Sequence, residues 1–459
     1  MLVDSHCHLQ DEAFRDDLDA VLDRARSGGV GLMVSVGSDL ETSQAAVALA
    51  EQHPEIYAAV GISPHDADTC TGDWLDQLRS LATSSDRVVA VGETGLDFFR
   101  EGVSHELQEE AFIQQIKLAW ELDLAVVVHC RQADEKVLQI LQEHAGSGQL
   151  RIIMHCFSGD EYLARGVLAM GYYLSFAGNL TYPKSRPTRR AAELVPDDRM
   201  LIETDAPYLP VQSARGQRCE PAMIEETAEK LAATRKLSRR DIERITERNF
   251  RIAFGLPLSR KDVFFYPMRE KLYVNLTNRC PNKCGFCPRG SDRYVISGHD
   301  LLLNREASAD EYIEALNSFE GFEELVFCGL GEPTVRMAEL VAVAAAARKK
   351  GYGRILLETN GLGSLINARK IAPDLAGLVD EVWVSINAPD ARVYSRLCKS
   401  AFGDKSYGAV LEFARDCKAA GMKVVLTAVN VPGVDIQGCL KAAKRLGMEF
   451  RSLKYQKLG

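Results

Sequence analysis

The chain has 459 residues, of which 46% are hydrophobic, and its formal net charge at pH 7 is −9. This length exceeds what one ordinary hydrophobic core accommodates and predicts two globular domains. No run of about 18 uninterrupted apolar residues occurs, and the first residues lack the basic and apolar regions of a signal peptide. These features argue against a membrane-spanning segment and predict a cytoplasmic protein with no membrane partner.

Charge is divided unevenly along the chain. Residues 271–459 carry a formal charge of +5, whereas residues 1–270 carry −14. An acidic first part argues against tight, non-specific binding of duplex DNA, which depends on a broad Lys/Arg surface. The 12 cysteines, in a chain with no export signal, favour metal ligands, core residues or reactive thiols over disulfides.

Short β-type runs alternate with segments that carry apolar residues at helical spacing over the first part of the chain. Strands that alternate with helices predict parallel βα units, and eight such units predict a closed (β/α)8 TIM barrel in residues 1–256. Residues 213–256 are expected to form helices that cap this barrel. The eight runs are Leu2–His8, Gly31–Gly37, Ile56–Ser63, Arg87–Thr94, Ala125–Cys130, Arg151–Cys156, Tyr172–Ala177 and Met200–Asp205.

Residues 257–269 mix Pro, charges and aromatic residues without a period, and we interpret them as a linker between two domains. Residues 270–459 form the second domain, in which β-type runs again alternate with helical segments. Because six βα units are too few to close an eight-stranded barrel, we expect a curved, open (β/α)6 partial barrel, so the whole chain is of the α/β class. The six runs are Leu272–Thr277, Glu324–Leu330, Arg354–Asn360, Glu381–Asn387, Lys423–Val429 and Phe450–Gln456.

Histidines and carboxylates lie at the C-terminal ends of five predicted barrel strands, the face on which TIM barrels carry their active sites. Side chains two residues apart on a strand point the same way, so two histidines of the first strand can face one cation while Cys7 points away. A single histidine at a strand end is as often a packed residue as a ligand, but a coincidence of six suitable residues is improbable. Imidazole and carboxylate ligands suit zinc, manganese or magnesium, and two such ions would share Glu93. The six residues are His6, His8, Glu93, His129, His155 and Asp205.

Five motifs that contain these residues, DSHCHL, GETGLDFF, VVVHCR, MHCFSG and ETDAPYL, resemble those of the TatD family of metal-dependent hydrolases. The resemblance covers residues 1–256. It implies metal ligation by the six residues named above, with Glu93 and Asp205 as catalytic residues and Asp205 placed to manage the proton of the attacking water. It also implies hydrolysis of a phosphodiester or related ester bond, because many members resemble deoxyribonucleases.

Two residues near the expected phosphate position depart from the family pattern and weaken the expectation of nuclease activity. Ser63 stands where the family usually has a histidine, and Cys219 stands where an asparagine is usual. Arg131, Arg215 and Arg218 are candidates for contact with an anion, although the last two fit a solvated surface equally well. Cys130 and Cys156 adjoin predicted ligands but alternate to the opposite side, so we interpret them as buried small hydrophobic residues.

Cys280, Cys284 and Cys287 follow the first predicted strand of the second domain with CxxxCxxC spacing. Such a loop supplies three thiolates to a 4Fe-4S cluster and leaves one iron for a substrate-like cofactor. Zinc is the alternative occupant, but no nearby histidine or cysteine at finger spacing would complete a zinc site. The second strand ends in CGLGEPT, where glycines permit close backbone approach and Glu332 offers an anion to an ammonium group.

The cysteine loop and the CGLGEPT motif, in this order, resemble the radical S-adenosylmethionine superfamily over residues 268–459, with Phe286 as the aromatic residue before the last cysteine. The resemblance implies a 4Fe-4S cluster on the three cysteines and reductive cleavage of S-adenosylmethionine with electrons from a donor such as flavodoxin or ferredoxin. Gly331 and Glu332 would bind the methionyl amine of the cofactor. Polar residues that cap strand ends are the alternative explanation for four further contacts. Those four are Thr359, Asn360, Ser385 and Asn387.

Three hypotheses for the whole chain follow. The favoured one is a bifunctional enzyme that combines metal-dependent hydrolysis with radical chemistry on a small-molecule or nucleotide-like substrate. A second is a nucleic-acid-processing protein, in which a nuclease cuts DNA or RNA that the radical domain modifies. A third makes the barrel a binding module for the radical domain, although its complete ligand set argues against a purely structural role.

Overall fold

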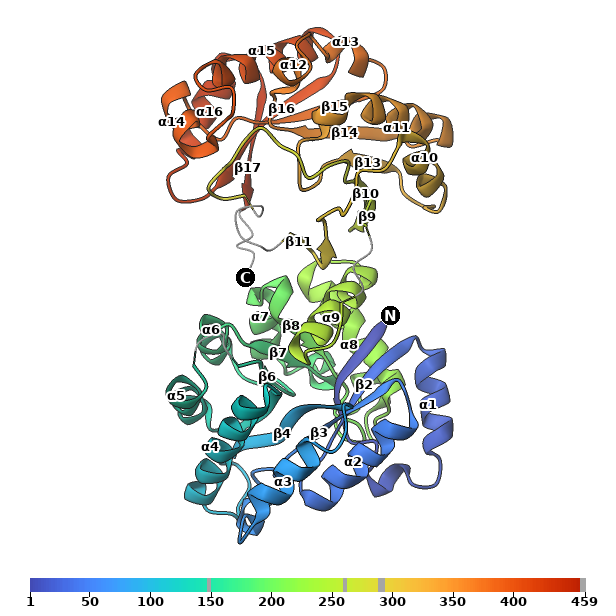
Figure 1. Cartoon of the computed structure of the whole chain (residues 1–459), viewed down its shortest axis with the longest axis vertical. Coiled ribbons are helices and arrows are strands. Elements are labelled where there is room, and N and C mark those ends of the chain that lie inside the picture. The colour runs from blue at the N-terminus through green and yellow to red at the C-terminus, as the bar shows by residue number, and fades with distance from the viewer. Residues whose placement is uncertain (147–149, 259–261, 288–293, 455–459) are drawn as a thin grey trace. The chain divides into compact units, whose positions relative to one another are not determined.

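A computed structural model describes residues 1–146, 150–258, 262–287 and 294–454 (Figure 1). The chain divides into two compact units: the elements from β1 to α9 belong to the first and those from β9 to β17 to the second. Among the helices of these described residues, none is long and apolar enough to cross a bilayer.

The strands of the first unit form one parallel sheet in the order in which they occur along the chain. Near the C-terminal ends of β1 and β8 the sheet closes on itself, because the N–H of Asp205 donates to His6 O at 2.9 Å and the N–H of His8 donates to Ala206 O at 2.7 Å. The predicted (β/α)8 barrel is therefore confirmed. Its strands are β1 Leu2–Cys7, β2 Val30–Val36, β3 Ile56–Val60, β4 Val88–Asp97, β5 Ala125–Arg131, β6 Ile152–Met154, β7 Tyr173–Phe176 and β8 Met200–Ile202.

Helices surround the barrel, and α9 also closes one of its ends. Phe250 of α9 and Phe254, directly after it, pack with Val3, Leu32 and Tyr173, which lie near the starts of their strands, so α9 covers the N-terminal end of the barrel. The candidate functional site lies at the opposite, C-terminal end of the barrel. The helices are α1 Leu18–Ser27, α2 Leu40–Gln52, α3 Trp74–Ala82, α4 His105–Leu122, α5 Asp134–His144, α6 Glu161–Ala169, α7 Arg186–Leu194, α8 Ile224–Arg235 and α9 Arg239–Ala253.

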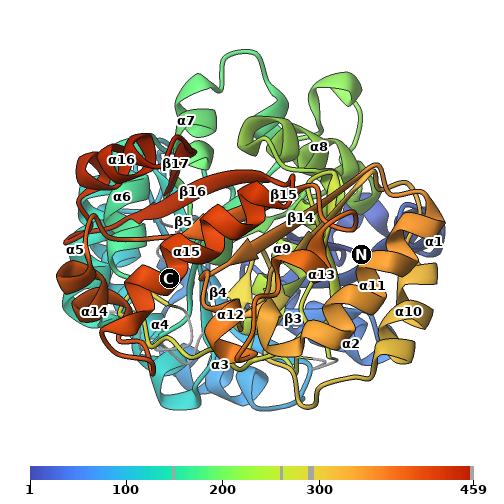
Figure 2. The same ribbon diagram turned by 90° about the horizontal axis from the view of Figure 1, so that it is seen from above.

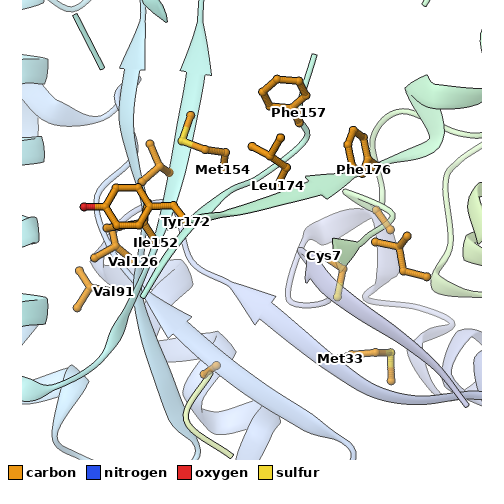
Figure 3. Close-up of a cluster of buried hydrophobic side chains, with 14 of the residues drawn as sticks. Cys7, Met33, Val91, Val126, Ile152, Met154, Phe157, Tyr172, Leu174 and Phe176 are labelled. Carbon is orange, nitrogen blue, oxygen red and sulfur yellow. The ribbon is translucent and has the colours of Figure 1, made fainter. Parts of the chain in front are cut away.

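A second group of buried side chains fills the layer between the strands and the surrounding helices (Figure 3). Val126, Ile152 and Leu174 come from neighbouring strands, and Phe157 follows β6. Cys7 lies in this layer with no exposed surface, as the alternation along β1 predicts, and its thiol donates to the carbonyl of Val34 at 3.3 Å. The outward turn of Cys7 leaves the histidines on either side of it facing the barrel interior.

Strands β4 and β5 approach each other closely at Gly95, which pairs with His129. Gly95 has a φ of +137°, and a Cβ atom there would lie 2.1 Å from the carbonyl oxygen of His129. Only glycine fits such a position, since any other residue would collide with the backbone of β5. This close contact fixes β4, which carries Glu93, against β5, which carries His129.

The second unit contains one seven-stranded sheet in the order β17-β16-β15-β14-β13-β10-β9. Six of its strands are parallel, which confirms the predicted open (β/α)6 partial barrel. The seventh, β9 (Phe265–Met268), pairs antiparallel with β10 and lies within the segment that we interpreted as a linker. The six parallel strands are β10 Lys271–Val274, β13 Glu324–Phe327, β14 Arg354–Thr359, β15 Glu381–Ser385, β16 Lys423–Asn430 and β17 Glu449–Lys454.

The strand β9 escaped sequence analysis because Pro267 and the aromatic residues around it obscure any alternation. The structure shows the alternation: Phe265 packs into the core of the second unit, whereas Tyr266 stacks on Tyr273 on the other face of the sheet. Antiparallel edge strands of this kind tolerate proline. Residues 259–261 of the interpreted linker and residues 455 and 456 of the last predicted strand lie outside the described residues.

Helices cover one face of the second sheet, as the view in Figure 2 shows for α10, α11, α13 and α15. The apolar residues that alternate toward this face, such as Val274, Phe327 and Leu357, pack with these helices. The opposite face carries polar residues at the same strands. The helices are α10 Ala309–Asn317, α11 Met337–Lys350, α12 Gly363–Ile366, α13 Ala372–Leu375, α14 Ala391–Cys398, α15 Lys405–Ala419 and α16 Ile436–Arg445; a short ribbon pairs β11 Val295–Ile296 with β12 His299–Asp300.

Replacement of Gly95 by alanine should destabilise the barrel more than the same change at Gly102. Both glycines have nearly the same φ, +137° and +138°, but no atom lies within 4 Å of a Cβ built at Gly102. Gly102→Ala therefore carries backbone strain alone, whereas Gly95→Ala adds an overpacking cost of about 1–3 kcal/mol. Differential scanning calorimetry of both full-length variants should give the lower Tm for Gly95→Ala. Equal Tm values would show that β4 and β5 are not in close contact there.

Candidate functional site

A cavity of about 900 Å³ opens at the C-terminal end of the barrel. Its floor is formed by side chains from the ends of β1, β4, β5, β6 and β8. Because β6 ends at Met154 and β8 at Ile202, His155 and Asp205 lie just beyond their strands rather than within them. The structure brings all six predicted ligands together on this floor, His6 lying buried behind the five residues that line the cavity.

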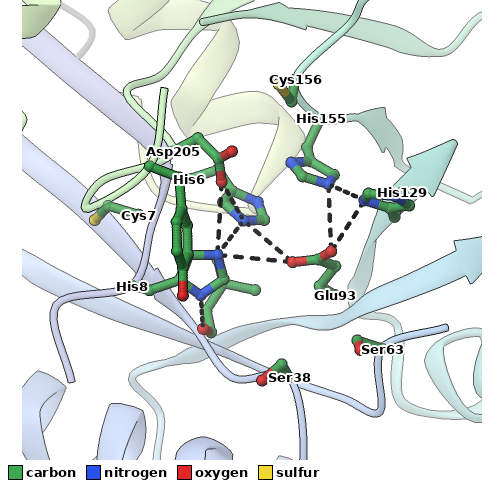
Figure 4. Close-up of polar contacts among 12 residues, drawn as sticks. His6, Cys7, His8, Ser38, Ser63, Glu93, His129, His155, Cys156 and Asp205 are labelled. Atoms are coloured by element: carbon green, nitrogen blue, oxygen red, sulfur yellow. Dashed lines mark hydrogen bonds and ion pairs between the residues drawn. The ribbon is translucent and has the colours of Figure 1, made fainter. Parts of the chain in front are cut away.

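Glu93 divides its two carboxylate oxygens between two pairs of histidines (Figure 4). Oε2 lies 3.5 Å from Nε2 of His6 and 3.7 Å from Nε2 of His8. On this side Oδ1 of Asp205 lies 3.6 Å from each of the same two nitrogens. The ring nitrogen Nδ1 of His8 donates to the carbonyl of Val36 at 2.7 Å, which leaves Nε2 with a lone pair directed into the group.

The second pair of histidines faces the other oxygen of Glu93. Oε1 lies 3.1 Å from Nδ1 of His129 and 3.6 Å from Nε2 of His155. Glu203 is fully buried behind His155, where its carboxylate accepts the N–H of Cys156 and lies 3.6 Å from Nδ1 of His155. Two groups of nitrogen and oxygen ligands therefore meet at one carboxylate.

The charges in this cluster depend on burial and on the neighbouring rings. Burial alone would raise the pKa of Glu93, but His155, His129 and His6 hold that pKa well below its usual value, so Glu93 is an anion. Burial and His155 lower the pKa of His6, which keeps this ring neutral. Burial alone would lower the pKa of His155, but the negative charges of Glu93 and Glu203 raise it well above its usual value.

The donor set fits divalent cations. Three buried carboxylates, Glu93, Glu203 and Asp205, form no ion pair with a lysine or arginine among the described residues. Three buried carboxylates close together are costly, and divalent cations between them would offset that cost more fully than a protonated His155 alone. The ligand atoms of two overlapping trios that share Glu93 lie within 4.8 Å of one another: one contains His6 and His8, the other His129 and His155.

In the second unit, the loop that carries Cys280, Cys284 and Cys287 is attached to α14. The N–H of Lys283 donates to the carbonyl of Cys398 at 2.9 Å. The buried side chain of Asn282 donates from Nδ2 to the hydroxyl of Tyr394 at 3.1 Å. The three cysteines and the neighbouring Phe286 are half-buried on this anchored loop.

The CGLGEPT turn lies directly against the cysteine loop. A Cβ atom at Gly331 would lie 2.3 Å from the carbonyl oxygen of Thr277 and 2.5 Å from that of Arg279, so the approach requires glycine. The N–H of Glu332 donates to the same carbonyl of Arg279 at 2.8 Å. The CGLGEPT turn is thus in backbone contact with the segment that leads directly into the cysteine loop, at Thr277 and Arg279.

The carboxylate of Glu332 accepts hydrogen bonds from three residues, which sequence analysis did not anticipate. Oε1 accepts the N–H of Thr334 at 3.1 Å and both the Thr334 and Thr359 hydroxyls at 2.7 Å, and Oε2 accepts the N–H of Asn360 at 2.7 Å. Burial raises the pKa of Glu332 in spite of these donors. The side chain of Asn360 in turn donates to the sulfur of Cys280 at 3.5 Å.

The remaining two predicted cofactor contacts lie at the ends of the neighbouring strands and have structural partners. The hydroxyl of Ser385 lies 3.2 Å from that of Thr427. Asn387, with a φ of +49°, accepts the N–H of Val429 on Oδ1 at 3.0 Å. The capping role that we weighed as an alternative therefore describes Asn387 in this structure.

Cys328 and Glu358 form a polar pair that sequence analysis did not identify. Phe327 of β13 pairs with Leu357 of β14, so the next residue of each strand lies beside the other. Burial raises the pKa of both groups, and the neighbouring Glu358 raises the pKa of the Cys328 thiol further. The pair lies on the face of the sheet opposite the helices, the face to which Asn360 also belongs.

Comparison with known families agrees with this geometry. A model of TatD related DNases matches residues 3–255, more than half of the chain. The chain belongs to the TatD related DNase family. Residues 274–446 match the radical SAM superfamily, so the chain joins a TatD domain to a radical SAM domain.

Individual relatives match the TatD domain. The uncharacterized metal-dependent hydrolase YabD of Bacillus subtilis is 37% identical over 256 residues, which are 56% of this chain and 100% of YabD. The 3'-5' ssDNA/RNA exonuclease TatD of Cronobacter sakazakii is 35% identical over 253 residues, 54% of this chain and 95% of that protein. The crystal structure of YJJV, a TatD homologue from Escherichia coli K12, has 31% identity and a TM-score of 0.53, and it covers 56% of this chain and 98% of that one.

The two departures from the TatD pattern have different positions. Ser63 lines the cavity, where its hydroxyl donates to Asp66 at 2.7 Å. Cys219 is buried in the layer between strands and helices, and its thiol donates to the carbonyl of Thr204 at 3.7 Å. Of the two departures, Ser63 is therefore the one that borders the space for a substrate.

Among the three arginines considered as anion contacts, Arg131 lines the cavity of the TatD domain. Arg218 is held by Asp17 and Glu220, and Arg215 stacks on the ring of Tyr182 at 4.5 Å. Arg100, which sequence analysis did not consider, also lines the cavity. The arginines that line the cavity are therefore Arg131, at the end of β5, and Arg100, just after β4.

Our interpretation of Cys130 and Cys156 as buried small hydrophobic residues holds in part for Cys130, which packs against the layer between strands and helices, and is wrong for Cys156. Both are half-buried, and both line the cavity of the TatD domain. Cys156 has a φ of +43°, so the chain turns immediately after β6 and strand alternation no longer applies. Cys130 lies near the end of β5, where its thiol is 3.6 Å from Oδ1 of Asp134.

Proposed function

We propose that the TatD domain holds two divalent cations, zinc, manganese or magnesium, and hydrolyses an ester bond of a phosphate-containing substrate. The arrangement of Glu93, with one oxygen toward each pair of histidines, is the observation that supports two ions. The first ion would be bound by His6, His8, Asp205 and Oε2 of Glu93, and the second by His129, His155 and Oε1 of Glu93. Such ions acidify water and polarise a phosphoryl oxygen.

Residues of the chain would position the ligands, accept the proton and face the charge of the substrate. Glu93 holds the two groups of ligands at a fixed separation. Burial would raise the pKa of Asp205, but the hydrogen bond from His8 and the nearby His6 lower it, so its carboxylate is ionised and can accept a proton from the attacking water. The cavity wall near Arg131 would face the negative charge of the substrate.

The relatives and the charge of the chain support a choice of substrate class. Relatives of the TatD domain include 3'-5' ssDNA/RNA exonucleases. The departure at Ser63 weakens the expectation of nuclease activity, and the acidic charge of residues 1–270 argues against tight duplex binding. We therefore propose a nucleotide-like or small phosphodiester substrate, with single-stranded DNA or RNA as the second candidate.

The hydrolytic role is tested with the full-length chain, loaded with Mn²⁺, on bis(p-nitrophenyl) phosphate and on a labelled single-stranded oligonucleotide. Asp205→Asn should lower kcat by about 10²- to 10⁴-fold, because the proton acceptor is lost while the shape of the site is kept. Asp19→Asn, an exposed change on α1, is the matched control and should retain wild-type kcat. Equal rates for the wild type and Asp205→Asn, at equal metal content, would contradict this role.

For the radical SAM domain, we propose that Cys280, Cys284 and Cys287 hold a 4Fe-4S cluster. Gly331 and Glu332 would bind the methionyl amine of S-adenosylmethionine, and the strand ends of β14 and β15 would contact the rest of the cofactor. A 4Fe-4S cluster held there, with a cytoplasmic flavodoxin or ferredoxin as electron donor, would supply the one electron for reductive cleavage of S-adenosylmethionine to methionine and a 5′-deoxyadenosyl radical. The contact between Asn360 and Cys280, next to the Glu332 network, supports a cluster and a cofactor site at one place.

This second role is tested on anaerobically reconstituted, dithionite-reduced protein with S-adenosylmethionine. The wild type should contain about four irons per chain and form 5′-deoxyadenosine, measured by mass spectrometry. Cys284→Ala should lose both, whereas Cys417→Ala, a buried core position of α15, should retain both. A wild-type protein with a full cluster that forms no 5′-deoxyadenosine would refute the radical assignment.

A further inference from the structure

Asp97, at the end of β4, lies between two histidines behind the cavity wall. Its side chain has no exposed surface. Oδ2 lies 2.8 Å from Nε2 of His65 and 3.3 Å from Nε2 of His129. Oδ1 accepts the backbone N–H groups of Phe99 at 2.9 Å and Arg100 at 3.0 Å, so both oxygens have fixed partners.

The backbone at Asp97 is fixed as well. The side chain of Gln108, from α4, accepts the N–H of Asp97 at 2.8 Å and donates to its carbonyl at 3.2 Å. Gln108 is itself almost fully buried. The position of the Asp97 carboxylate therefore depends on both the strand and the helix that follows it, and little freedom remains for it to move.

The contact between Asp97 and His129 determines which nitrogen of His129 is available to a metal. With Nε2–H donating to the carboxylate, the lone pair lies on Nδ1, the nitrogen that faces Glu93 and His155 at 3.1 Å each. A carboxylate that accepts the second ring N–H fixes the tautomer and orientation of a metal-binding histidine and raises its basicity. Asp97 thus meets the requirements for such a partner.

The contact between Asp97 and His65 likewise fixes the tautomer of His65, which borders the space for a substrate. With Nε2–H donating to Asp97, Nδ1 of His65 is an acceptor, and it lies 3.3 Å from Nη1 of Arg100. His65 and Arg100 both line the cavity, and the ring centroid of His65 lies 5.6 Å from that of His129. A guanidinium held in this way faces the same space as the proposed ions and suits a phosphate oxygen.

We propose that Asp97 is a positioning residue that orients His129 for metal binding and, through His65, holds Arg100 as the contact for an anionic phosphate group of the substrate. The proposal rests on the metal centre described under the proposed function. A third cation bound by His65, Asp97 and His129, whose ligand atoms lie within 4.8 Å of one another, is the competing arrangement. It would require His129 to bind metals through both nitrogens at once.

The metal part of the proposal is tested by calorimetric titration of the metal-free, full-length protein with Mn²⁺ alone. Asp97→Asn keeps the shape of the side chain but weakens the acceptor, and it should raise the Kd for Mn²⁺ by about 10- to 100-fold. Asp66→Asn is the matched control, since Asp66 lines the same cavity and bonds Ser63 instead of a metal-facing histidine. Its Kd should stay within about twofold of the wild type, which is far below the change expected from a lost partner.

The anion part is tested with inorganic phosphate as the probe, titrated into Mn²⁺-loaded protein. Arg100→Ala should raise the Kd for phosphate about tenfold, the loss expected for one hydrogen bond to a charged group, without a change in the Kd for Mn²⁺. Arg165→Ala, an exposed change on α6, should leave both constants unchanged. Asp97→Asn should raise both constants, which a merely local packing defect would not do.

The outcomes separate this inference from the function on which it rests. A wild-type protein that binds no Mn²⁺ would refute the metal centre itself and the inference with it. Normal Mn²⁺ binding in the wild type and in Asp97→Asn alike would refute only the positioning role. A loss of one Mn²⁺ from three in Asp97→Asn would establish the third cation instead, and an unchanged phosphate Kd in Arg100→Ala would refute the anion contact.

Discussion

The burial of one carboxylate between four histidine rings is the constraint on which the TatD domain depends. Glu93 lies where two histidine pairs meet, and it is an anion with no lysine or arginine partner among the described residues. Its position requires β4 to stay close to β1, β5 and β6, and the glycine contact at Gly95 provides the approach of β4 to β5. A cation pair at this point would compensate the buried charge and hold four strands together. The stability of the barrel and its hydrolytic chemistry would then both require the bound cations.

Much of the barrel and of its ligand set was predictable from sequence because both depend on simple periodicities. Alternating runs of strand and helix determine the parallel order, and parallel strands present their C-terminal ends at one face. His6 and His8 share a side because they are two residues apart, and Cys7 turns outward for the same reason. In the second unit, the cluster and cofactor motifs were recognised from the spacing of the three cysteines and from the position of the CGLGEPT turn after the next strand.

The rest was not predictable because it depends on side-chain contacts and on backbone turns beyond the strand ends. Asp97 is part of a motif that sequence analysis used, yet its bonds to two histidines depend on the approach of β5, which carries His129, and of the loop after β3, which carries His65. Cys156 faces the cavity because of a left-handed turn, which alternation does not describe. The strand β9 and the hydrogen bonds to Glu332 likewise depend on partners distant in sequence.

The most direct test of the account is the coordination of zinc in the barrel. Zinc X-ray absorption should be measured on the full-length chain with Cys280→Ser, Cys284→Ser and Cys287→Ser, so that only the barrel binds the metal. Two zinc ions per chain are expected, with nitrogen and oxygen ligands at about 2.0–2.2 Å. Zinc–sulfur distances of about 2.3 Å, from thiols such as Cys156, or retention of less than one zinc per chain, would contradict this expectation.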